Sequence, residues 1–320
     1  MKRLLIPIVA LCAATAASAQ TQSWPNRPVR VIVPFTAGSG TDIAARAVTE
    51  RLAVQTGQPF VVENRPGAGG TIGQAVVAKA EPDGYTILIH SSSQTVTPST
   101  YQNLPFDTLR DFSGITMLAN IPNVLVVAPN RGFKTVQDLV SEAKAKPNTL
   151  TYASAGMGSA THLNAERFRL GAGLVATHVP YKGTPEALTD VMGGRVDYYF
   201  CPVVNALPLL RDGKLVALAV GSSKRSSALP ELPTTEEAGI PNSAYNFWVG
   251  MFAPSKTPRE IVARLHAETV KALNSPEVKE RYARLGAEFQ IFTPEQFDDY
   301  LRKEVASNAQ LVKAADIKVQ

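Results

Sequence analysis

Short runs of apolar, β-branched residues alternate along this chain with longer segments in which apolar residues recur at helical spacing. Residues 29–35 (VRVIVPF) form the first run, which is typical of a buried parallel strand. A glycine loop follows, and residues 42–57 then carry a helical pattern that ends at Gly57. Two further strands are predicted at residues 59–64 and 85–93, with a second glycine loop and a short helix between them. This order predicts a βαβαβ unit with right-handed crossovers and a parallel sheet.

The same order of elements is predicted a second time in the middle of the chain. Strands are expected at residues 148–155, 174–181 and 196–202, with helices between them. The loop that opens each copy reads G-x-G-[ST]. Aligning the two loops at a separation of 118 residues pairs Gly38 with Gly156, Gly40 with Gly158 and Thr41 with Ser159. A repeated motif in the same context predicts two similar α/β lobes.

Two apolar strands, at residues 123–130 and 247–255, are predicted to cross between the lobes. The pattern after them is helical in three segments, in which Pro258, Pro276 and Pro294 stand at first helical positions. Helices without a new sheet are expected to pack back onto the first lobe, which would then be discontinuous. The predicted domains are a signal peptide at 1–19, a first lobe at 20–122 and 250–320, and a second lobe at 123–249.

The first 19 residues have the pattern of a secretory signal peptide. Lys2 and Arg3 precede an apolar run, and Ala17-Ser18-Ala19 offers a small-residue cleavage site. The apolar run is shorter than the roughly 18 residues that would span a bilayer, so we expect a protein that does not itself span the membrane. Leu11 before Cys12 disfavours lipid attachment. These features predict export to the periplasm.

The composition and net charge of the chain exclude an intrinsically disordered protein and a nucleic-acid partner. With 320 residues, 45% of them hydrophobic, the chain can bury a large core and is too apolar to be disordered. Cleavage after Ala19 would remove two of the 32 Lys and Arg residues. The remaining 30 basic residues against 27 acidic ones give the mature chain a net charge of +3. The chain has no basic run, so nucleic acid is excluded as a partner. Cleavage would leave Cys201 as the one cysteine, and we expect a buried free thiol.

The two glycine loops carry the candidate chemistry. Each leaves the carboxyl end of a strand and opens a helix, so backbone N–H groups and the positive helix end converge on one point. Two such anion sites, facing each other across a hinged cleft, would clamp a carboxylate. The alternative is that the glycines only make tight turns. The candidate residues are Thr36, Ala37, Gly38, Ser39, Gly40 and Thr41 in the first lobe and Ser154, Ala155, Gly156, Met157, Gly158 and Ser159 in the second.

Residues beside these loops are further candidates. Asp42 would order the first loop, pair with Arg46, or contact an amine of the ligand. Ser91 and Ser92 end the third strand and would offer hydroxyl groups at the same edge of the sheet. The others are Tyr181 and Thr184 as hydrogen-bonding groups, Lys182 as a counter-ion or a solvated surface lysine, and Phe35, Phe247 and Trp248 as apolar cleft walls or core residues.

Several enzyme signatures are incomplete. Gly38 and Gly40 imitate a dinucleotide-binding loop, but Ile43 occupies the third glycine position. The second glycine loop is out of register for a serine-hydrolase elbow, and Ser141 with Lys144 lacks the companion motifs of a penicillin-binding site. The four histidines are scattered. We therefore expect no catalytic residue, metal or cofactor. A secreted α/β enzyme acting on a carboxylate is the competing hypothesis.

Blocks of sequence along nearly the whole mature chain resemble one protein family. They are VPFTAGSGTDIAAR, VVENRPGAGGTIG, EPDGYTILI, YASAGMGSATHL, HVPYKGTPEALTDVMGGRVDYYF and MFAPSKTP, in that order. These blocks are similar to those of the Bug family of periplasmic substrate-binding proteins, also called the TctC or tripartite tricarboxylate transporter receptor family.

This resemblance implies a type II periplasmic binding fold, in which two Rossmann-like α/β lobes joined by two crossover strands close around a carboxylate. Residues 35–42 and 154–159 would hold the carboxylate through backbone groups, hydroxyls and ordered waters, often without a charged counter-ion. Gly38-Ser39 stands where the family usually has a double glycine. The implied partners are a two-component membrane transporter and a sensor kinase, for a receptor expected to be a monomer. Dicarboxylates, tricarboxylates, aromatic acids and amino acids all stay open as ligands.

Overall fold

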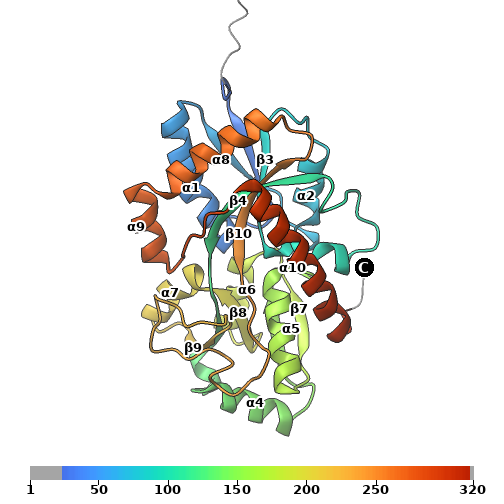
Figure 1. Cartoon of the computed structure of the whole chain (residues 1–320). Helices are drawn as coiled ribbons and strands as arrows, with labels where there is room; N and C mark the ends of the chain where they lie inside the picture. Colours follow the sequence, from blue (N-terminus) through green and yellow to red (C-terminus); the bar gives the residue numbers. More distant parts are fainter. Residues whose placement is uncertain (1–23, 318–320) are drawn as a thin grey trace, which may run out of the picture.

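Two α/β lobes, each built on a five-stranded sheet, make up the molecule (Figure 1). The structure is a computed structural model that describes residues 24–317. The predicted signal peptide at residues 1–19, with Cys12, lies outside the described residues. The α/β class and the two lobes expected from the repeated pattern are confirmed.

The first sheet combines parallel strands with one antiparallel insertion. Its strands are β1 (Val29–Val33), β2 (Phe60–Asn64), β3 (Thr86–Ser91), β4 (Phe112–Asn120) and β10 (Trp248–Pro254). They lie in the order β2-β1-β3-β10-β4. β1 is parallel to β2 and β3, whereas β10 is antiparallel to both of its neighbours. β1 and β3 are almost fully buried, which explains why they read as continuous apolar runs.

The helices of the first lobe come from both ends of the chain. They are α1 (Gly40–Thr56), η1 (Ala68–Gly70), α2 (Thr71–Ala78), η2 (Ser92–Thr95), α3 (Thr97–Thr100), α8 (Arg259–Leu273), α9 (Pro276–Leu285) and α10 (Pro294–Ala314). α8 and α9 pack against α1, and α10 packs against β4. Pro276 and Pro294 are the first residues of their helices, whereas Pro258 precedes α8 as its N-cap.

The second lobe repeats the topology of the first. Its strands are β5 (Asn123–Val127), β6 (Thr151–Ser154), β7 (Thr177–Pro180), β8 (Tyr198–Pro202) and β9 (Val216–Val220), in the order β7-β6-β8-β5-β9. Its helices are η3 (Pro129–Arg131), α4 (Val136–Ala145), α5 (Ala160–Ala172), α6 (Thr184–Met192) and α7 (Val203–Arg211). β5 is the antiparallel strand here, as β10 is in the first sheet. Two C-terminal helices of the first lobe also contact this lobe, because α9 packs against α7 and α10 packs against α5 (Figure 1).

Two adjacent crossovers link the lobes. The chain passes from β4 to β5 through Ile121 and Pro122, and it returns to the first lobe as β10 begins. Ile121 N donates to Phe247 O at 2.9 Å, which ties the two crossovers together. Because β10 begins at Trp248, the predicted boundary between residues 249 and 250 falls inside this strand.

Of the three buried hydrophobic clusters in the described chain, one extends through both lobes. Val33 and Ile89 of the first sheet belong to the same buried cluster as Ala153 and Tyr199 of the second. Cys201 is buried and free, as predicted. Among the helices within residues 24–317, none has the length and apolarity needed to cross a bilayer.

Candidate functional site

The first glycine loop joins β1 to α1 and brings the start of that helix next to the second lobe. Ser39 is the N-cap residue of α1, and its N–H donates to Thr36 O at 3.1 Å. Gly38 has a φ of +79°, a left-handed conformation that glycine adopts without strain. Asn205 of the second lobe donates to Gly38 O at 2.7 Å. The first N–H groups of α1 have no acceptor within the helix, so they are available at this end.

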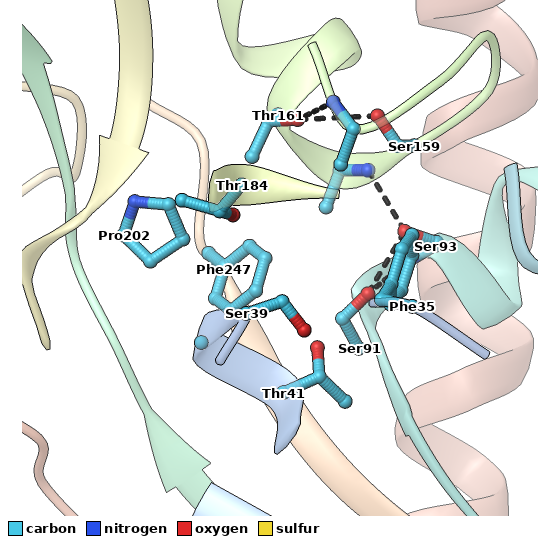
Figure 2. A pocket seen from close by; sticks show the side chains of 13 residues that line it. Phe35, Ser39, Thr41, Ser91, Ser93, Ser159, Thr161, Thr184, Pro202 and Phe247 are labelled. Atoms are coloured by element: carbon cyan, nitrogen blue, oxygen red, sulfur yellow. Dashed lines mark hydrogen bonds between the residues drawn. The ribbon is translucent and has the colours of Figure 1, made fainter. Parts of the chain in front are cut away.

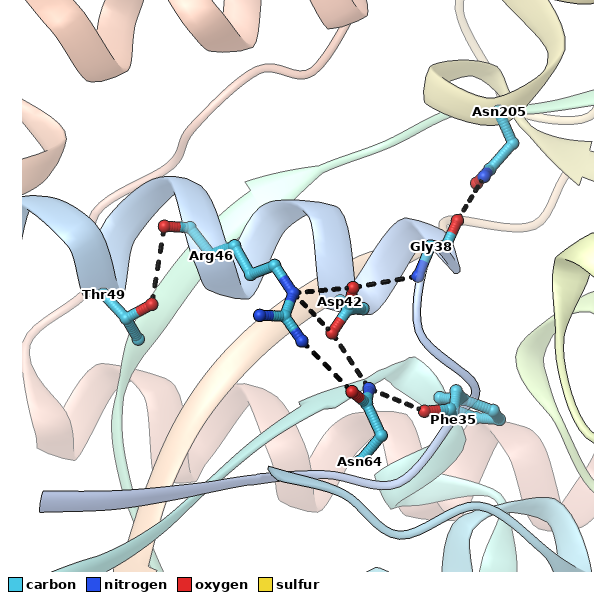
Figure 3. A network of polar contacts seen from close by, with 7 residues as sticks. All are labelled: Phe35, Gly38, Asp42, Arg46, Thr49, Asn64 and Asn205. Atoms are coloured by element: carbon cyan, nitrogen blue, oxygen red, sulfur yellow. Dashed lines mark hydrogen bonds and ion pairs between the residues drawn. The ribbon is translucent and has the colours of Figure 1, made fainter. Parts of the chain in front are cut away.

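Asp42 orders the first loop (Figure 3). Its carboxylate accepts hydrogen bonds from Gly38 N at 2.9 Å, Asn64 Nδ2 at 2.9 Å and Arg46 Nε at 3.0 Å. Asn64 Nδ2 also donates to Phe35 O at 2.9 Å. Asp42 is buried and does not line the pocket described below. These contacts favour the loop-ordering and Arg46-pairing interpretations of Asp42 over contact with a ligand.

The second glycine loop repeats this geometry at the start of α5. Ser159 is the N-cap, its N–H donates to Gly156 O at 3.1 Å, and Gly158 has a φ of +71°. Gly158 N donates to His162 Nδ1 at 3.2 Å, so His162 occupies the position that Asp42 holds in the first loop. Equivalent residues are therefore 120 positions apart. The predicted alignment at 118 is wrong by two residues, because the glycines were matched instead of the N-cap serines.

Two stacked imidazole rings support the second loop. The ring centroids of His162 and His178 are 4.0 Å apart, and His178 Nε2 lies 2.6 Å from Ser154 Oγ. Burial lowers the pKa of His162 to about 4 and the pKa of His178 to about 3. Both rings are therefore neutral at pH 7. Only an unprotonated Nδ1 can accept the hydrogen bond from Gly158 N, so the loop geometry depends on this neutrality.

An uncharged pocket lies between the two loops (Figure 2). Its cavity volume is about 10 Å³, which is about the space that one water molecule needs. The first lobe and the crossover supply Phe35, Ser39, Gly40, Thr41, Ser91, Ser93 and Phe247, and the second lobe supplies Ala155, Ser159, Ala160, Thr161, Thr184 and Pro202. Among these lining residues of the described chain, none carries a charged side chain. The described chain also contains no group of three or more His, Cys, Asp or Glu residues that could hold a metal ion.

The hydroxyl group of Ser39 is the clearest unused polar group in the pocket. It is 3% exposed, makes no side-chain cap on α1, and has no hydrogen-bond partner in the described structure. Burying a hydroxyl without a partner costs free energy, so this group is suited to a ligand. Ser159, its equivalent, differs because its Oγ accepts from His162 N and caps α5.

Ser93 connects the two lobes inside the pocket. Its Oγ accepts a hydrogen bond from Ala160 N, in the first turn of α5, at 2.9 Å and lies 2.8 Å from Ser91 Oγ (Figure 2). In the second lobe, Thr161 Oγ1 accepts from Ala155 N at 3.0 Å. The N–H groups at the N-terminus of α5 therefore already donate to side chains of the protein. In the described structure, the N–H groups at the N-terminus of α1 have no such acceptor.

The structure divides the predicted site residues into two groups. Those that line the pocket are Phe35, Ser39, Gly40, Thr41, Ser91, Ala155, Ser159 and Thr184. Those that do not are Thr36, Ala37, Gly38, Asp42, Ser92, Ser154, Gly156, Met157, Gly158 and Tyr181. In the second group, Ser154 Oγ contacts His178 and Tyr181 OH donates to Asp190, so both groups have partners within the second lobe. Contact with a ligand stays a prediction for all of them.

Several lining residues are missing from the predicted set. Ser93 follows the two serines that were chosen, and Thr161 holds the place in α5 that Thr41 holds in α1. The corrected separation of 120 residues would have found Thr161. Of the residues predicted as apolar cleft walls or core residues, Phe247 lines the pocket, whereas Trp248 is fully buried against Phe297 in the core of the first lobe.

Comparison with known proteins identifies the family. The model of the tripartite tricarboxylate transporter family receptor, TctC, matches residues 44–317. The chain belongs to this family. BugT of Bordetella pertussis is 37% identical over 324 residues, which cover 100% of this chain and 99% of BugT.

Two solved structures resemble the chain over nearly its whole length. Periplasmic binding protein BugD is 34% identical with a TM-score of 0.88, and the alignment covers 93% of this chain and 100% of BugD. R. palustris Rpa4515 with adipate is 35% identical with a TM-score of 0.89, over 93% of this chain and 100% of that protein. The type II periplasmic binding fold is thereby confirmed, and the TctC chain described here has the architecture of a binding protein.

Proposed function

We propose that the chain is a periplasmic receptor that captures a small organic carboxylate between its lobes and delivers it to a two-component membrane transporter. Family membership supports the receptor role, and the adipate bound by a relative supports the class of ligand. The signal peptide predicted at residues 1–19 would place the receptor in the periplasm.

One observation carries the proposal: the pocket is uncharged but lies at the N-terminus of a 17-residue helix whose N-cap hydroxyl has no partner among residues 24–317. The helix end of α1 attracts an anion through its dipole and through its first N–H groups. Ser39 Oγ adds a hydroxyl donor at the same point. A carboxylate would therefore be bound without a lysine or arginine, and Lys182 is exposed outside the pocket.

Both lobes contribute to the pocket, which suits a receptor that closes around its ligand. Ser39 and Thr41 come from the first lobe, and Ser159 and Thr184 from the second. The Oγ1 atom of Thr184 lies 3.1 Å from Tyr199 OH, which fixes the orientation of the threonine side chain. A ligand that contacts all four side chains would stabilise the closed arrangement of the lobes.

A thermal-shift screen of the chain without its signal peptide tests the proposal. Organic acids are compared in pairs with their own amides, which keep the shape but lose the charge. An acid at about 100 times its dissociation constant should stabilise the native state by roughly 2.7 kcal/mol, and its amide should not. Equal stabilisation by acid and amide would contradict carboxylate recognition. Conversion of a bound acid into a product would instead favour the competing enzyme hypothesis.

A further inference from the structure

The cavity between the two glycine loops is too small for an organic acid. Its volume of about 10 Å³ leaves room for about one water molecule. Because its walls come from both lobes, moving the lobes apart about the two crossovers enlarges it. An acid therefore enters a form that is more open than this structure, and every contact that joins the lobes at the cavity opposes its entry.

Ser93 joins the two lobes at the wall of this cavity (Figure 2). It lies in η2 of the first lobe and is fully buried. Its Oγ accepts a hydrogen bond from Ala160 N of the second lobe at 2.9 Å. Ala160 is the first residue of α5, so its N–H has no acceptor within the helix and is one of those that a helix end offers to an anion. The hydroxyl of Ser93 thus occupies a donor that a carboxylate could use.

A second contact joins the lobes beside the cavity. Tyr101 OH of the first lobe donates to Met157 O, in the second glycine loop, at 3.0 Å. The backbones are also close here, since a Cβ atom built on Gly69 would lie 2.2 Å from Met157 O. Neither Tyr101 nor Met157 lines the cavity. This contact therefore holds the lobes together without occupying a donor at the end of α5.

We propose that Ser93 is an internal competitor of the ligand: by accepting from Ala160 N across the lobes, it holds a closed form that excludes the carboxylate. This inference rests on the proposed function and adds a contact that regulates it. A ligand that binds only the opened form has its affinity reduced by the fraction of molecules in that form. Removing the Ser93 hydroxyl raises this fraction and frees the N–H of Ala160, so it strengthens binding.

Calorimetric titration with succinate, adipate and benzoate tests the direction of the effect. Ser93→Ala should bind these acids about fivefold more tightly than the wild-type chain, because the closed form loses one hydrogen bond between the lobes. Tyr101→Phe should also strengthen binding, since it removes only the hydroxyl that joins the lobes outside the cavity. A serine that contacted the ligand directly would give the opposite result, which is weaker binding by Ser93→Ala.

Ser275→Ala is a matched control within one lobe. Ser275 Oγ accepts from Val278 N at 3.4 Å and caps α9, and it donates to Ala272 O at 2.8 Å. Both partners belong to the first lobe, so this variant should lower the melting temperature and leave the affinity for each acid unchanged. A gain in affinity equal to that of Ser93→Ala would mean that any loss of stability favours binding, and would overturn the role of Ser93.

Small-angle scattering of the ligand-free chain tests the closed form without any acid. The wild-type chain should have the radius of gyration of this structure, and the Ser93→Ala, Tyr101→Phe double variant should have a larger one. Equal radii, or weaker binding of the acids by Ser93→Ala, would overturn the role of Ser93 alone.

The proposed function fails on a different result. If neither the wild type nor the variants bind any small organic acid, carboxylate capture is contradicted. The scattering comparison then still decides whether Ser93 holds the lobes together.

Discussion

Ser39 and Ser159 occupy equivalent positions, but their hydroxyl groups have different partners. Ser159 Oγ caps α5, whereas Ser39 Oγ is buried without a partner in the part of the chain that the structure describes. This difference separates a structural serine from one that is available to a ligand. It could not be predicted from the sequence, because both serines precede a helix and follow a glycine.

Alanine substitution should therefore affect binding at Ser39 and stability at Ser159. Ser39→Ala should weaken carboxylate binding about three- to tenfold and leave the free energy of unfolding within about 0.5 kcal/mol, because no protein hydrogen bond is lost. Ser159→Ala should destabilise the fold by about 1 kcal/mol through the lost cap. Calorimetric titration and urea unfolding of the two variants measure both quantities. A Ser39→Ala variant that binds normally would exclude the hydroxyl from the site.

The stability of the chain should depend on the neutral state of His162. Its pKa is about 4 in the folded chain, against about 6.5 for an unperturbed histidine. Between these values the unfolded chain binds a proton that the folded chain does not. Stability is therefore complete above about pH 6.5 and falls as the pH is lowered toward 4, by about 1.4 kcal/mol per pH unit.

Urea unfolding at pH 7 and pH 5 checks this dependence. His178 adds to it, since burial lowers its pKa as well, and Arg169 and Glu166 are the charged groups that act on the pair. His162→Asn keeps an acceptor side chain beside Gly158 N and cannot titrate, so its loss of stability between the two pH values should be smaller. Equal losses in the variant and the wild type would mean that His162 is already protonated in the folded chain.

The N-terminus of α1, rather than a cation, is expected to supply the attraction for the ligand. Lys182→Ala should change carboxylate affinity less than about twofold, because an exposed charge is screened by solvent and salt. Gly38→Val, in the loop that opens α1, should reduce affinity at least about a hundredfold. A side chain there is strained at a φ of +79° and would disturb the loop that Asp42 orders.

Titration of both variants, with circular dichroism to confirm folding, distinguishes the two kinds of recognition. A large loss in Lys182→Ala combined with normal binding in Gly38→Val would favour a counter-ion pocket over recognition by the end of α1.

The helices and strands were predictable where the pattern was long or repeated. α1 and the parallel strands β1 and β3 follow apolar periodicity. β4 was missed because its apolar residues are mixed with Ser113, Gly114 and Thr116. α7 was missed because Pro208 lies inside it, and a proline usually ends a helical pattern. β9 is too short and uniform an apolar run to assign by periodicity.

The arrangement of the two lobes was predictable only in outline. The repeated unit predicts two lobes, and the resemblance to the TctC family predicts that they enclose a cleft. Contacts between the lobes join residues far apart in sequence, such as Ser93 with Ala160 and Thr36 with Gly183. No local pattern marks such pairs, because they depend on how the crossovers orient one lobe against the other.

A crystal structure of the chain with the acid that gives the largest thermal shift is the most direct test of carboxylate recognition between the lobes. We expect one carboxylate within hydrogen-bond distance of Ser39 Oγ and of the first N–H groups of α1, with no lysine or arginine beside it. A carboxylate paired with Lys182, or bound outside the pocket between the glycine loops, would contradict recognition by the helix end.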